Sequence, residues 1–327
     1  MKLSDAGELS LLEILRKRFG KRSHSIVLGI GDDAAVIRPQ NSHMLLTTDM
    51  MVEGVHFDLS WTTPFQLGFK LVSVNVSDIY AMGGKPKFLL LNFSASKDTT
   101  LEFFSKFFDG IETAMKRYGI SLIGGDISAS EKIVLSATVT GYAKKFLARR
   151  GARAGDRIYV TGHTGDAACG LALMKGLRRK IAIEQGKKQK FPLPWEIVSP
   201  LIERHLMPVA RDSQGFIKAA TSMIDISDGL MIDISRLCRE SKVGALVYAD
   251  KIPLSNELQK ASEYLGMSPL ELALGGGEDY ELLFTAPANK KVNAYCIGEV
   301  IKTGIFLMDE KGHKRKASIK GYQHFKI

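Results

Sequence analysis

The spacing of apolar side chains along the chain predicts helices and strands in alternation. Apolar residues recur every three or four positions in residues 64–82 and 100–118, a period that predicts helices with one buried face. Apolar runs at 43–48 and 88–93, and a run rich in β-branched residues at 133–142, predict strands. The same reasoning adds a helix at 9–19 and strands at 34–38 and 122–125. This order predicts a mixed sheet with its helices on one face.

A second set of elements begins after a basic, glycine-containing stretch at 144–155. We expect helices at 166–175, 196–205, 210–220, 230–242, 256–265 and 269–274, and strands at 157–162, 222–224, 244–249, 282–285, 295–300, 305–308 and 317–319. Residues 175–194 are expected to form an exposed loop or a frayed helix end. The sequence thus predicts an α+β protein of two related α/β halves, with domains at 1–145 and 146–327.

The composition agrees with a globular protein of that size. The 327 residues can form two domains, and 45% hydrophobic with 24% charged residues is ordinary for a soluble chain. No apolar run approaches the roughly 18 residues of a membrane span, and the N-terminus lacks a secretory signal pattern. Three widely separated cysteines (Cys169, Cys238 and Cys296) are typical of reduced thiols. These features predict a cytoplasmic protein.

The net charge of +10 is concentrated in two stretches, residues 175–190 and 311–326. Such stretches can bind nucleic acid. They lack interleaved aromatic residues, however, and acidic clusters elsewhere would repel a phosphate backbone. We therefore favour solvated faces or attraction of a small polyanion over nucleic acid.

Aspartates recur where predicted apolar segments begin or end, usually beside Gly, Ser or Thr. The five places are Gly31-Asp32-Asp33, Thr47-Thr48-Asp49, Asn75-Val76-Ser77-Asp78, Gly124-Gly125-Asp126 and Asp225-Ile226-Ser227-Asp228-Gly229. A single Gly-Asp pair indicates only a turn. Five repeats indicate oxygen ligands for a hard cation, since Mg²⁺ is commonly held by a few carboxylates and by substrate phosphates.

Common motifs of nucleotide-binding and hydrolytic proteins are absent from the sequence. It has no G-x-x-x-x-G-K-[ST] loop, no zinc-ligand spacing and no G-x-S-x-G nucleophile. A site made of aspartates, glycines and several Mg²⁺ ions suits phosphoryl transfer, which needs mainly positioning and charge neutralisation. If the acceptor is itself a phosphate, no general base is required.

An ordered set of motifs spans nearly the whole chain. Besides the aspartate segments it comprises Gly7-Glu8-Leu9, Gly29-Ile30-Gly31, Met50-Met51-Val52-Glu53-Gly54-Val55-His56-Phe57, Met82-Gly83-Gly84, Arg149 with Gly151-Ala152, Ile158-Tyr159-Val160-Thr161-Gly162, Gly276-Gly277-Glu278-Asp279-Tyr280-Glu281 and Lys320-Gly321-Tyr322. The set resembles the thiamine-monophosphate kinase family of the aminoimidazole-ribonucleotide-synthetase-like (PurM-like) superfamily. Each motif alone is weak, whereas the ordered set is specific.

The resemblance implies ATP-dependent phosphorylation of thiamine monophosphate by direct in-line transfer, in a homodimer built through the N-terminal halves. The N-terminal half would bind ATP and metal, and the C-terminal half would complete the active site. The implied ligands of several Mg²⁺ ions are Asp33, Thr47, Thr48, Asp49, Asp78, Asp126, Asp225 and Asp228. Asp32 stays unassigned, and no catalytic acid or base is implied.

The resemblance also implies residues for the two substrates. Those for ATP are Gly125, Asp126, Arg149 and Ser227, together with Phe108, which stands where relatives often have a tyrosine. Those for thiamine monophosphate are His56, Glu278 and Tyr322. Each of these three also has a structural interpretation: a packed histidine, a turn carboxylate and a surface tyrosine.

The sequence departs from the family pattern at three places, and several alternative functions have to be weighed against the resemblance. Ile127-Ser128 replaces a favoured Thr-Thr, Phe108 lacks the tyrosine hydroxyl, and only eight residues separate Thr285 from Ala294, where relatives have a helix. A selenophosphate synthetase would need an N-terminal cysteine, and the hydrogenase-maturation dehydratase would end in one. Aminoimidazole-ribonucleotide synthetase is the rival among enzymes, and an inactive metal- or nucleic-acid-binding scaffold is the rival from another class.

Overall fold

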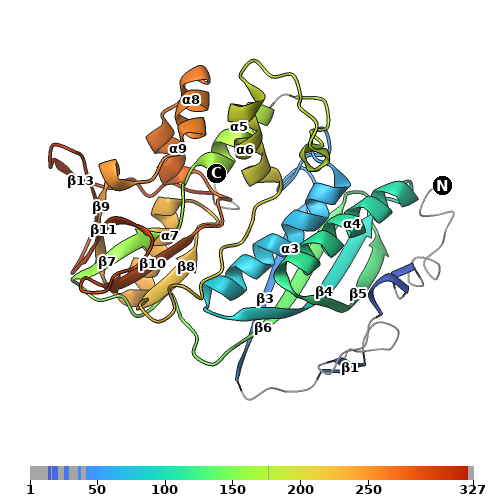
Figure 1. Ribbon diagram of the computed structural model, residues 1–327, viewed down its shortest axis with the longest axis horizontal. Helices are drawn as coiled ribbons and strands as arrows, with labels where there is room; N and C mark the ends of the chain where they lie inside the picture. The colour runs from blue at the N-terminus through green and yellow to red at the C-terminus, as the bar shows by residue number, and fades with distance from the viewer. Residues whose placement is uncertain are drawn as a thin grey trace. The chain divides into compact units, whose positions relative to one another are not determined.

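The computed structural model describes residues 14–15, 17–20, 42–175 and 177–322, and the backbone of strands β1 (Ile26–Leu28) and β2 (Val36–Ile37). The chain divides into two compact units. Unit 1 comprises Met1–Ile79, Gly84–Lys145 and Arg178–Gln185, and unit 2 comprises Tyr80–Gly83, Phe146–Leu177 and Gly186–Ile327. Both combine a sheet with helices, which is the α+β architecture predicted from the sequence (Figure 1).

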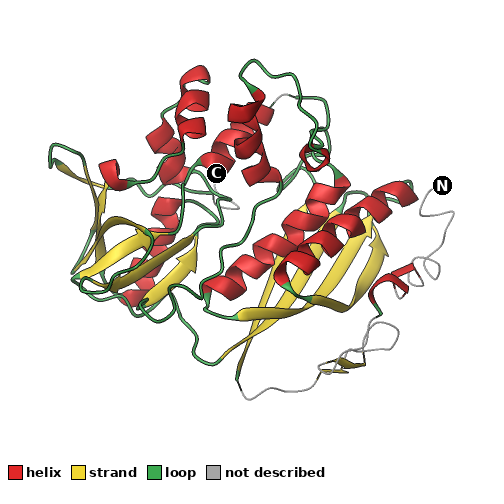
Figure 2. Ribbon diagram, viewed as in Figure 1, coloured by secondary structure: helices red, strands yellow, loops and turns green. Residues whose placement is uncertain are grey.

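Unit 1 contains a four-stranded mixed sheet with the order β3-β6-β4-β5. Its strands are β3 (His43–Val52), β4 (Lys85–Ala95), β5 (Ser121–Ala129) and β6 (Val134–Ala143). β4 and β5 are parallel, while β6 is antiparallel to β3 and β4. Helices α3 (Pro64–Ala81) and α4 (Leu101–Tyr118) cover one face of this sheet, as Figure 2 shows. The predicted mixed sheet with helices on one face is therefore present.

Local sequence signals explain the ends of α4. The Thr100 hydroxyl accepts a hydrogen bond from the backbone N–H of Phe103, and Gly119 ends the helix with φ +66°. α3 and α4 approach closely at two glycines, since a Cβ on Gly68 would lie 2.1 Å from the carbonyl oxygen of Phe107 and one on Gly110 would lie 1.9 Å from that of Phe65. The helix pair thus depends on residues that have no side chain.

An aromatic cluster forms the interior of unit 1 between α4 and the sheet. Phe93 of β4 lies 5.2 to 6.4 Å, centroid to centroid, from three rings of α4: Phe104, Phe107 and Phe108. All four side chains are buried. This cluster is why the phenylalanine stripe of α4 faces inward.

Unit 2 contains a seven-stranded sheet with the order β13-β12-β9-β11-β7-β10-β8. Its strands are β7 (Asp156–Val160), β8 (Ser222–Asp225), β9 (Gly244–Tyr248), β10 (Leu282–Pro287), β11 (Tyr295–Ile301), β12 (Ile305–Met308) and β13 (Lys314–Lys316). Its helices are α5 (Asp166–Met174), α6 (Trp195–Leu206), α7 (Leu230–Ser241), α8 (Asn256–Tyr264), α9 (Pro269–Gly275) and the short 3₁₀ helix η2 (Ala249–Lys251).

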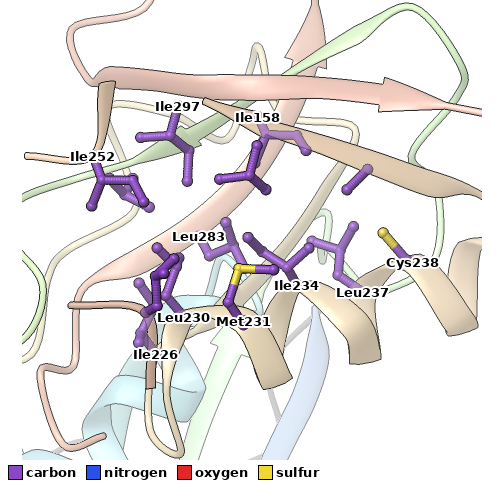
Figure 3. Close-up of a cluster of buried hydrophobic side chains, with 14 of the residues drawn as sticks. Ile158, Ile226, Leu230, Met231, Ile234, Leu237, Cys238, Ile252, Leu283 and Ile297 are labelled. Carbon is purple, nitrogen blue, oxygen red and sulfur yellow. The ribbon is translucent and has the colours of Figure 1, made fainter. Parts of the chain in front are cut away.

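The main core of unit 2 lies between α7 and the sheet. Leu230, Met231 and Ile234 of α7 face Ile158, Leu283 and Ile297 of the strands (Figure 3). The alternating pattern of the strands and the helical stripe of α7 bury the same cluster. Ile226, which follows β8, belongs to it and fixes the chain just before Asp228.

Part of the basic loop predicted at 175–194, residues Arg178–Gln185, belongs to unit 1. Ile181 is buried, and its backbone N–H donates to the carbonyl oxygen of Trp61 at 2.8 Å. Glu184, in the 3₁₀ helix η1 (Ile183–Gln185), accepts hydrogen bonds from the Thr63 hydroxyl at 3.0 Å and from Nε2 of Gln66 at 2.7 Å. We call Arg178–Gln185 the anchored segment.

Two predicted elements are wrong. Residues 210–220 form turns instead of a helix, because the side chain of Asp212 accepts from the N–H of Gln214 and Gly215 follows directly. The last strand is Lys314–Lys316 instead of 317–319. Asp309 sets this register by accepting hydrogen bonds from the backbone N–H groups of Lys311 and His313 in the preceding turn.

Two predicted elements near the N-terminus are described only in part. Of the helix predicted at 9–19, the described residues 14–15 and 17–19 are helical, and the strand predicted at 34–38 is described only at Val36–Ile37. The short connection after Thr285 contains no helix, as its length predicted. In the part of the chain that the structure describes, every helix is too short or too polar to cross a lipid bilayer.

Candidate active site

A direct contact joins two predicted oxygen ligands in unit 1. The hydroxyl of Thr47 on β3 donates a hydrogen bond of 2.6 Å to Oδ2 of Asp78 on α3. Both side chains lie between the sheet and the helix layer and are half-buried. The alternation of β3 explains this, because Thr47 and Asp49 point to the side on which Met51 is buried.

Two further predicted ligands of unit 1, Thr48 and Asp126, occupy the opposite, open face of the sheet. Thr48 is exposed, and its hydroxyl donates to Ala137 O at 3.0 Å and accepts from the Thr138 hydroxyl at 3.1 Å. Asp126 on β5 pairs with Asn92 of β4. Across the sheet, this pair lies one residue position away from the row that contains Asp49. By register, Asp126 therefore faces the same way as Thr48 and away from Asp78.

Gly125 has a packing reason to be glycine. Its φ is +154°, and a Cβ there would lie 1.8 Å from the carbonyl oxygen of Leu91. The close approach of β5 to β4 at this point therefore excludes any side chain. The backbone next to Asp126 is consequently exposed.

His56 lies in a tight turn that follows β3. Its Nδ1 accepts a hydrogen bond of 3.0 Å from the backbone N–H of Val52, so the neutral ring carries its proton on Nε2. Gly54 allows the turn with φ +80°, and its N–H donates to Phe57 O at 2.9 Å. The half-buried ring is thus held by the local backbone.

Three segments that are far apart in the sequence converge in unit 2. The backbone N–H of Glu278 donates to Ser227 O at 2.8 Å, and the backbone N–H of Tyr322 donates to Asp228 O at 2.9 Å. A Cβ on Gly277 would lie 2.5 Å from Ser227 O, so glycine is required for this approach. Four predicted site residues (Ser227, Asp228, Glu278 and Tyr322) are therefore brought together.

The Asp228 carboxylate is held by a residue that sequence reasoning missed. Arg236 of α7 contacts Oδ2 of Asp228 at 2.6 Å and Oδ1 of Asp233 at 2.7 Å. Asp233 is fully buried, and this burial raises its pKa to about 6. The i,i+3 spacing of Asp233 and Arg236 on a helix was a usable signal for their pairing, but nothing local pointed to Asp228.

The carboxylates that follow Glu278 anchor the same segment. Asp279 is fully buried and accepts hydrogen bonds from the N–H groups of Gly165 and Ala167 at the start of α5, and burial raises its pKa to about 7. Glu281 is buried against Arg204 (2.7 Å) and Arg211 (2.8 Å). The pKa of Glu281 is lowered, because hydrogen bonding from Arg211 and the charge of Arg204 outweigh its desolvation.

Two further predicted residues lie elsewhere in unit 2. Asp225 ends β8, is buried, and is level with Leu282 of β10. Arg149 is exposed, and its carbonyl oxygen accepts a hydrogen bond of 2.9 Å from Ser241 at the end of α7. Its guanidinium therefore reaches solvent from a fixed backbone position.

Phe108 and Asp33 stand apart from these groups. Phe108 is 1% exposed, and it packs within the aromatic cluster of unit 1. Packing by itself accounts for a phenylalanine there, and the structure offers no support for a nucleotide contact. Asp33, like the motifs at 7–9 and 29–35, lies outside the described residues.

The oxygen donors of this site are of the type that a hard cation such as Mg²⁺ prefers. Thr47 and Asp78 supply paired oxygen atoms, and Mg²⁺ needs only one or two protein carboxylates when substrate phosphates complete its shell. Among residues 42–175 and 177–322 and the few described before them, no group of three or more His, Cys, Asp or Glu side chains could hold a metal ion.

Sequence families match both halves of the chain. Residues 31–143 match the AIR synthase related protein N-terminal domain, and residues 153–308 match the corresponding C-terminal domain. The fold and these two matches define the chain as an AIR synthase-related protein with the PurM-like fold.

Individual relatives are more specific. The chain is 38% identical to thiamine-monophosphate kinase of Aquifex aeolicus, over 99% of this chain and 100% of the relative. It is 33% identical to the Escherichia coli K12 thiamine-monophosphate kinase, over 98% of each. The chain belongs to the thiamine-monophosphate kinase family.

Solved structures agree with this membership. AaThiL complexed with AMPPCP and TMP superimposes with a TM-score of 0.76 and 37% identity, covering 99% of both chains. The Stenotrophomonas maltophilia K279a thiamine-monophosphate kinase gives 0.77 and 32%, covering 91% of this chain and 95% of the other. Hydrogenase maturation protein HypE in complex with ATP, at 17% identity and a TM-score of 0.71, shares the fold.

Proposed function

We propose that this enzyme transfers the terminal phosphoryl group of ATP to the phosphate of thiamine monophosphate, forming thiamine diphosphate and ADP. The observation that carries the proposal is the full-length match to thiamine-monophosphate kinase at 38% identity. A related structure that shares 37% identity holds an ATP analogue and TMP. The enzyme is accordingly a phosphotransferase with a phosphate group as acceptor.

The residues proposed to hold Mg²⁺ are those that the family resemblance implied. Thr47 and Asp78 have the support of their paired oxygen atoms between β3 and α3, and Asp49 lies on the same side of β3 as Thr47. Asp33, Thr48, Asp126, Asp225 and Asp228 are proposed on the resemblance alone. When bound, Mg²⁺ would neutralise charge on the phosphate oxygens and align the two phosphates for in-line transfer.

The protein's own groups bind and orient the substrates. We assign Gly125, Asp126, Arg149 and Ser227 to ATP, and Arg149 offers forked donors suited to phosphate. We assign His56, Glu278 and Tyr322 to thiamine monophosphate, whose thiazolium ring is cationic. Glu278 supplies a negative charge, and Tyr322 supplies an aromatic face for a cation.

We also propose that the enzyme works as a homodimer formed through unit 1. The open face of its sheet exposes Met44, Leu46 and Met50, the last two at 63% and 55%. A row of exposed apolar side chains on a sheet is typical of a protein interface. Cytoplasmic location, the roles of the two domains and the absence of nucleic-acid binding stay predictions from the sequence.

The decisive test is product formation with purified protein. With ATP, Mg²⁺ and thiamine monophosphate, we expect equal amounts of ADP and thiamine diphosphate, and no turnover when EDTA replaces Mg²⁺. Thiamine in place of its monophosphate is the acceptor control, because it lacks the attacking phosphate oxygen.

Other outcomes would identify the rivals. ADP formed only with formylglycinamidine ribonucleotide would overturn the proposal in favour of aminoimidazole-ribonucleotide synthetase. No turnover with either substrate, together with DNA binding that persists at about 0.2 M salt, would favour the inactive scaffold.

A further inference from the structure

The C-terminal end of α6 meets the segment that contains Glu278. We call Gly277–Glu281 the acidic segment. Arg204 and His205, consecutive residues of α6, contact two of its carboxylates: Arg204 contacts Glu281, and Nδ1 of His205 lies 3.0 Å from Oε2 of Glu278. Neither α6 residue belongs to the motifs that indicated the function.

The acidic segment is fixed on both sides of Glu278. Asp279 accepts two backbone hydrogen bonds at the start of α5, and Glu281 is buried between two arginines. On the other side, the N–H of Glu278 bonds to Ser227 O. The backbone at Glu278 therefore has little freedom to move.

The backbone conformation of Glu278 is unfavourable by itself. Glu278 and Tyr280 have φ values of +66° and +51°, a backbone region that residues other than glycine rarely adopt. Such strain persists only where the surroundings enforce it, and it concentrates at functional sites. The strained backbone aims the Glu278 side chain, but it leaves the side-chain torsions undetermined.

His205 is placed to determine those torsions. Its side chain is 7% exposed, whereas that of Glu278 is 29% exposed. The imidazole thus lies behind the carboxylate, and the carboxylate reaches solvent. Nδ1 of the ring lies at ion-pair distance from Oε2, without the angle of a hydrogen bond, and this close contact with a buried side chain restricts the carboxylate to one orientation.

We propose that His205 is a positioning residue for thiamine monophosphate: it holds the Glu278 carboxylate in place for the cationic part of this substrate. The inference rests on the proposed function and deepens it. Holding the side chain before binding removes part of the ordering entropy that a ligand would otherwise offset. His205 thereby acts on acceptor affinity and has no part in the phosphoryl transfer itself.

The test compares two substitutions of His205. In His205→Leu, which removes the imidazole and its polar contact with the carboxylate, we expect the KM for thiamine monophosphate to rise about tenfold, the effect of one lost polar contact to a charged group. The KM for ATP and kcat should change less than about twofold. In His205→Asn the side-chain amide can replace Nδ1, so the KM should stay within about threefold of wild type.

Coupling to Glu278 separates positioning from a general structural role. In a Glu278→Gln background, His205→Leu should raise the KM for thiamine monophosphate by less than about twofold, because the carboxylate is already gone. Calorimetric binding of thiamine monophosphate without ATP should show the same pattern. His313→Leu is the matched control, since His313 also contacts a carboxylate (Asp309, 3.2 Å) but is exposed on the β12–β13 turn.

The outcomes are distinct. An unchanged KM for thiamine monophosphate in His205→Leu, or an equal rise with and without Glu278, would overturn the inference while the wild type still turns over this substrate. Failure of the wild type itself would overturn the proposed function. If His205→Leu does not fold, His205→Phe, which also lacks the imidazole nitrogens, replaces it in the same comparison with and without Glu278→Gln.

Discussion

At Asp78 a hydroxyl and a carboxylate from different elements share one hydrogen bond. The 2.6 Å contact with Thr47 orients Oδ2 of Asp78 between β3 and α3. The pair supplies little packing, since both residues are only half-buried and polar. We therefore expect Asp78 to contribute to the site through its negative charge.

Replacement of Asp78 by Asn tests that role. The amide oxygen can still accept from Thr47, so we expect a native circular dichroism spectrum and a melting temperature close to wild type. Loss of the negative charge should lower kcat at least about 100-fold through weaker Mg²⁺ binding. The apparent Mg²⁺ affinity, measured by Mn²⁺ competition, should fall in parallel.

Asp250→Asn is the control for this substitution, because Asp250 is a surface aspartate of η2 that pairs with the neighbouring Lys251. It should leave the rate and the Mg²⁺ dependence unchanged. A near-normal rate in Asp78→Asn would remove Asp78 from the metal site.

At the scale of elements, α5 receives its N-terminal cap from a distant segment. Asp279 accepts from Gly165 and Ala167, whereas Gly165 at the N-cap has no side chain to do so. Burial raises the pKa of Asp279 from 3.8 to about 7. The native carboxyl therefore keeps a proton that the unfolded chain releases near pH 4.

This difference makes stability depend on pH. Because the native state binds one proton more between about pH 4 and pH 7, its free energy of unfolding falls as the pH rises through that window. Asp279→Asn lacks the titration, so the wild type should lose roughly 1–2 kcal/mol relative to the variant between pH 5 and pH 7. Urea unfolding at both pH values measures this, and a constant difference would contradict the raised pKa.

The anchored segment shows a similar dependence on distant partners. Glu184→Ala would leave Nε2 of Gln66 and the hydroxyl of Thr63 without their carboxylate acceptor in a buried position. We expect a loss of roughly 1–3 kcal/mol in unfolding free energy and faster tryptic cleavage at Arg178, Arg179 and Lys180. Urea unfolding and timed proteolysis measure the two effects.

Glu196→Ala is the matched control, since Glu196 forms an exposed contact with Lys188 in the same basic loop. It should change stability by less than about 0.5 kcal/mol. Equal cleavage rates in the two variants would show that Glu184 does not hold the segment.

At the scale of the whole molecule, the open face of the unit 1 sheet is the feature that a single chain leaves unexplained. Three of its exposed apolar side chains, Met44, Leu46 and Met50, lie on alternate positions of β3, so one partner surface could cover them together. Leu46→Lys combined with Met50→Lys would place two charges on that face. Burying unpaired charges in an interface is costly, and we expect the dimer to dissociate.

Sedimentation velocity distinguishes the outcomes by mass. The wild type should sediment as two chains and the double variant as one, with an unchanged circular dichroism spectrum. Tyr264→Lys, a substitution at an exposed aromatic residue of unit 2, should remain dimeric. A double variant that stays dimeric would place the interface elsewhere.

Prediction from the sequence succeeded where the signal is local. The stripes of α3 and α4 and the strand runs of both sheets were all visible, because burial on one face imposes a short period. Residues 210–220 were mistaken for a helix, since the pattern did not show that Asp212 and Gly215 favour turns. Thr47 and Asp78 were identified separately, and only their contact was new.

The amino-acid sequence by itself determined the order of elements, the two related halves and the family, because periodicity and motifs are properties of neighbouring residues. The tertiary structure alone decided which distant residues meet. His205 behind Glu278, Arg236 beside Asp228, Asp279 at the start of α5 and the anchored segment in unit 1 are all of this kind. Such pairs depend on strand register and helix packing, which bring together side chains that no local pattern connects.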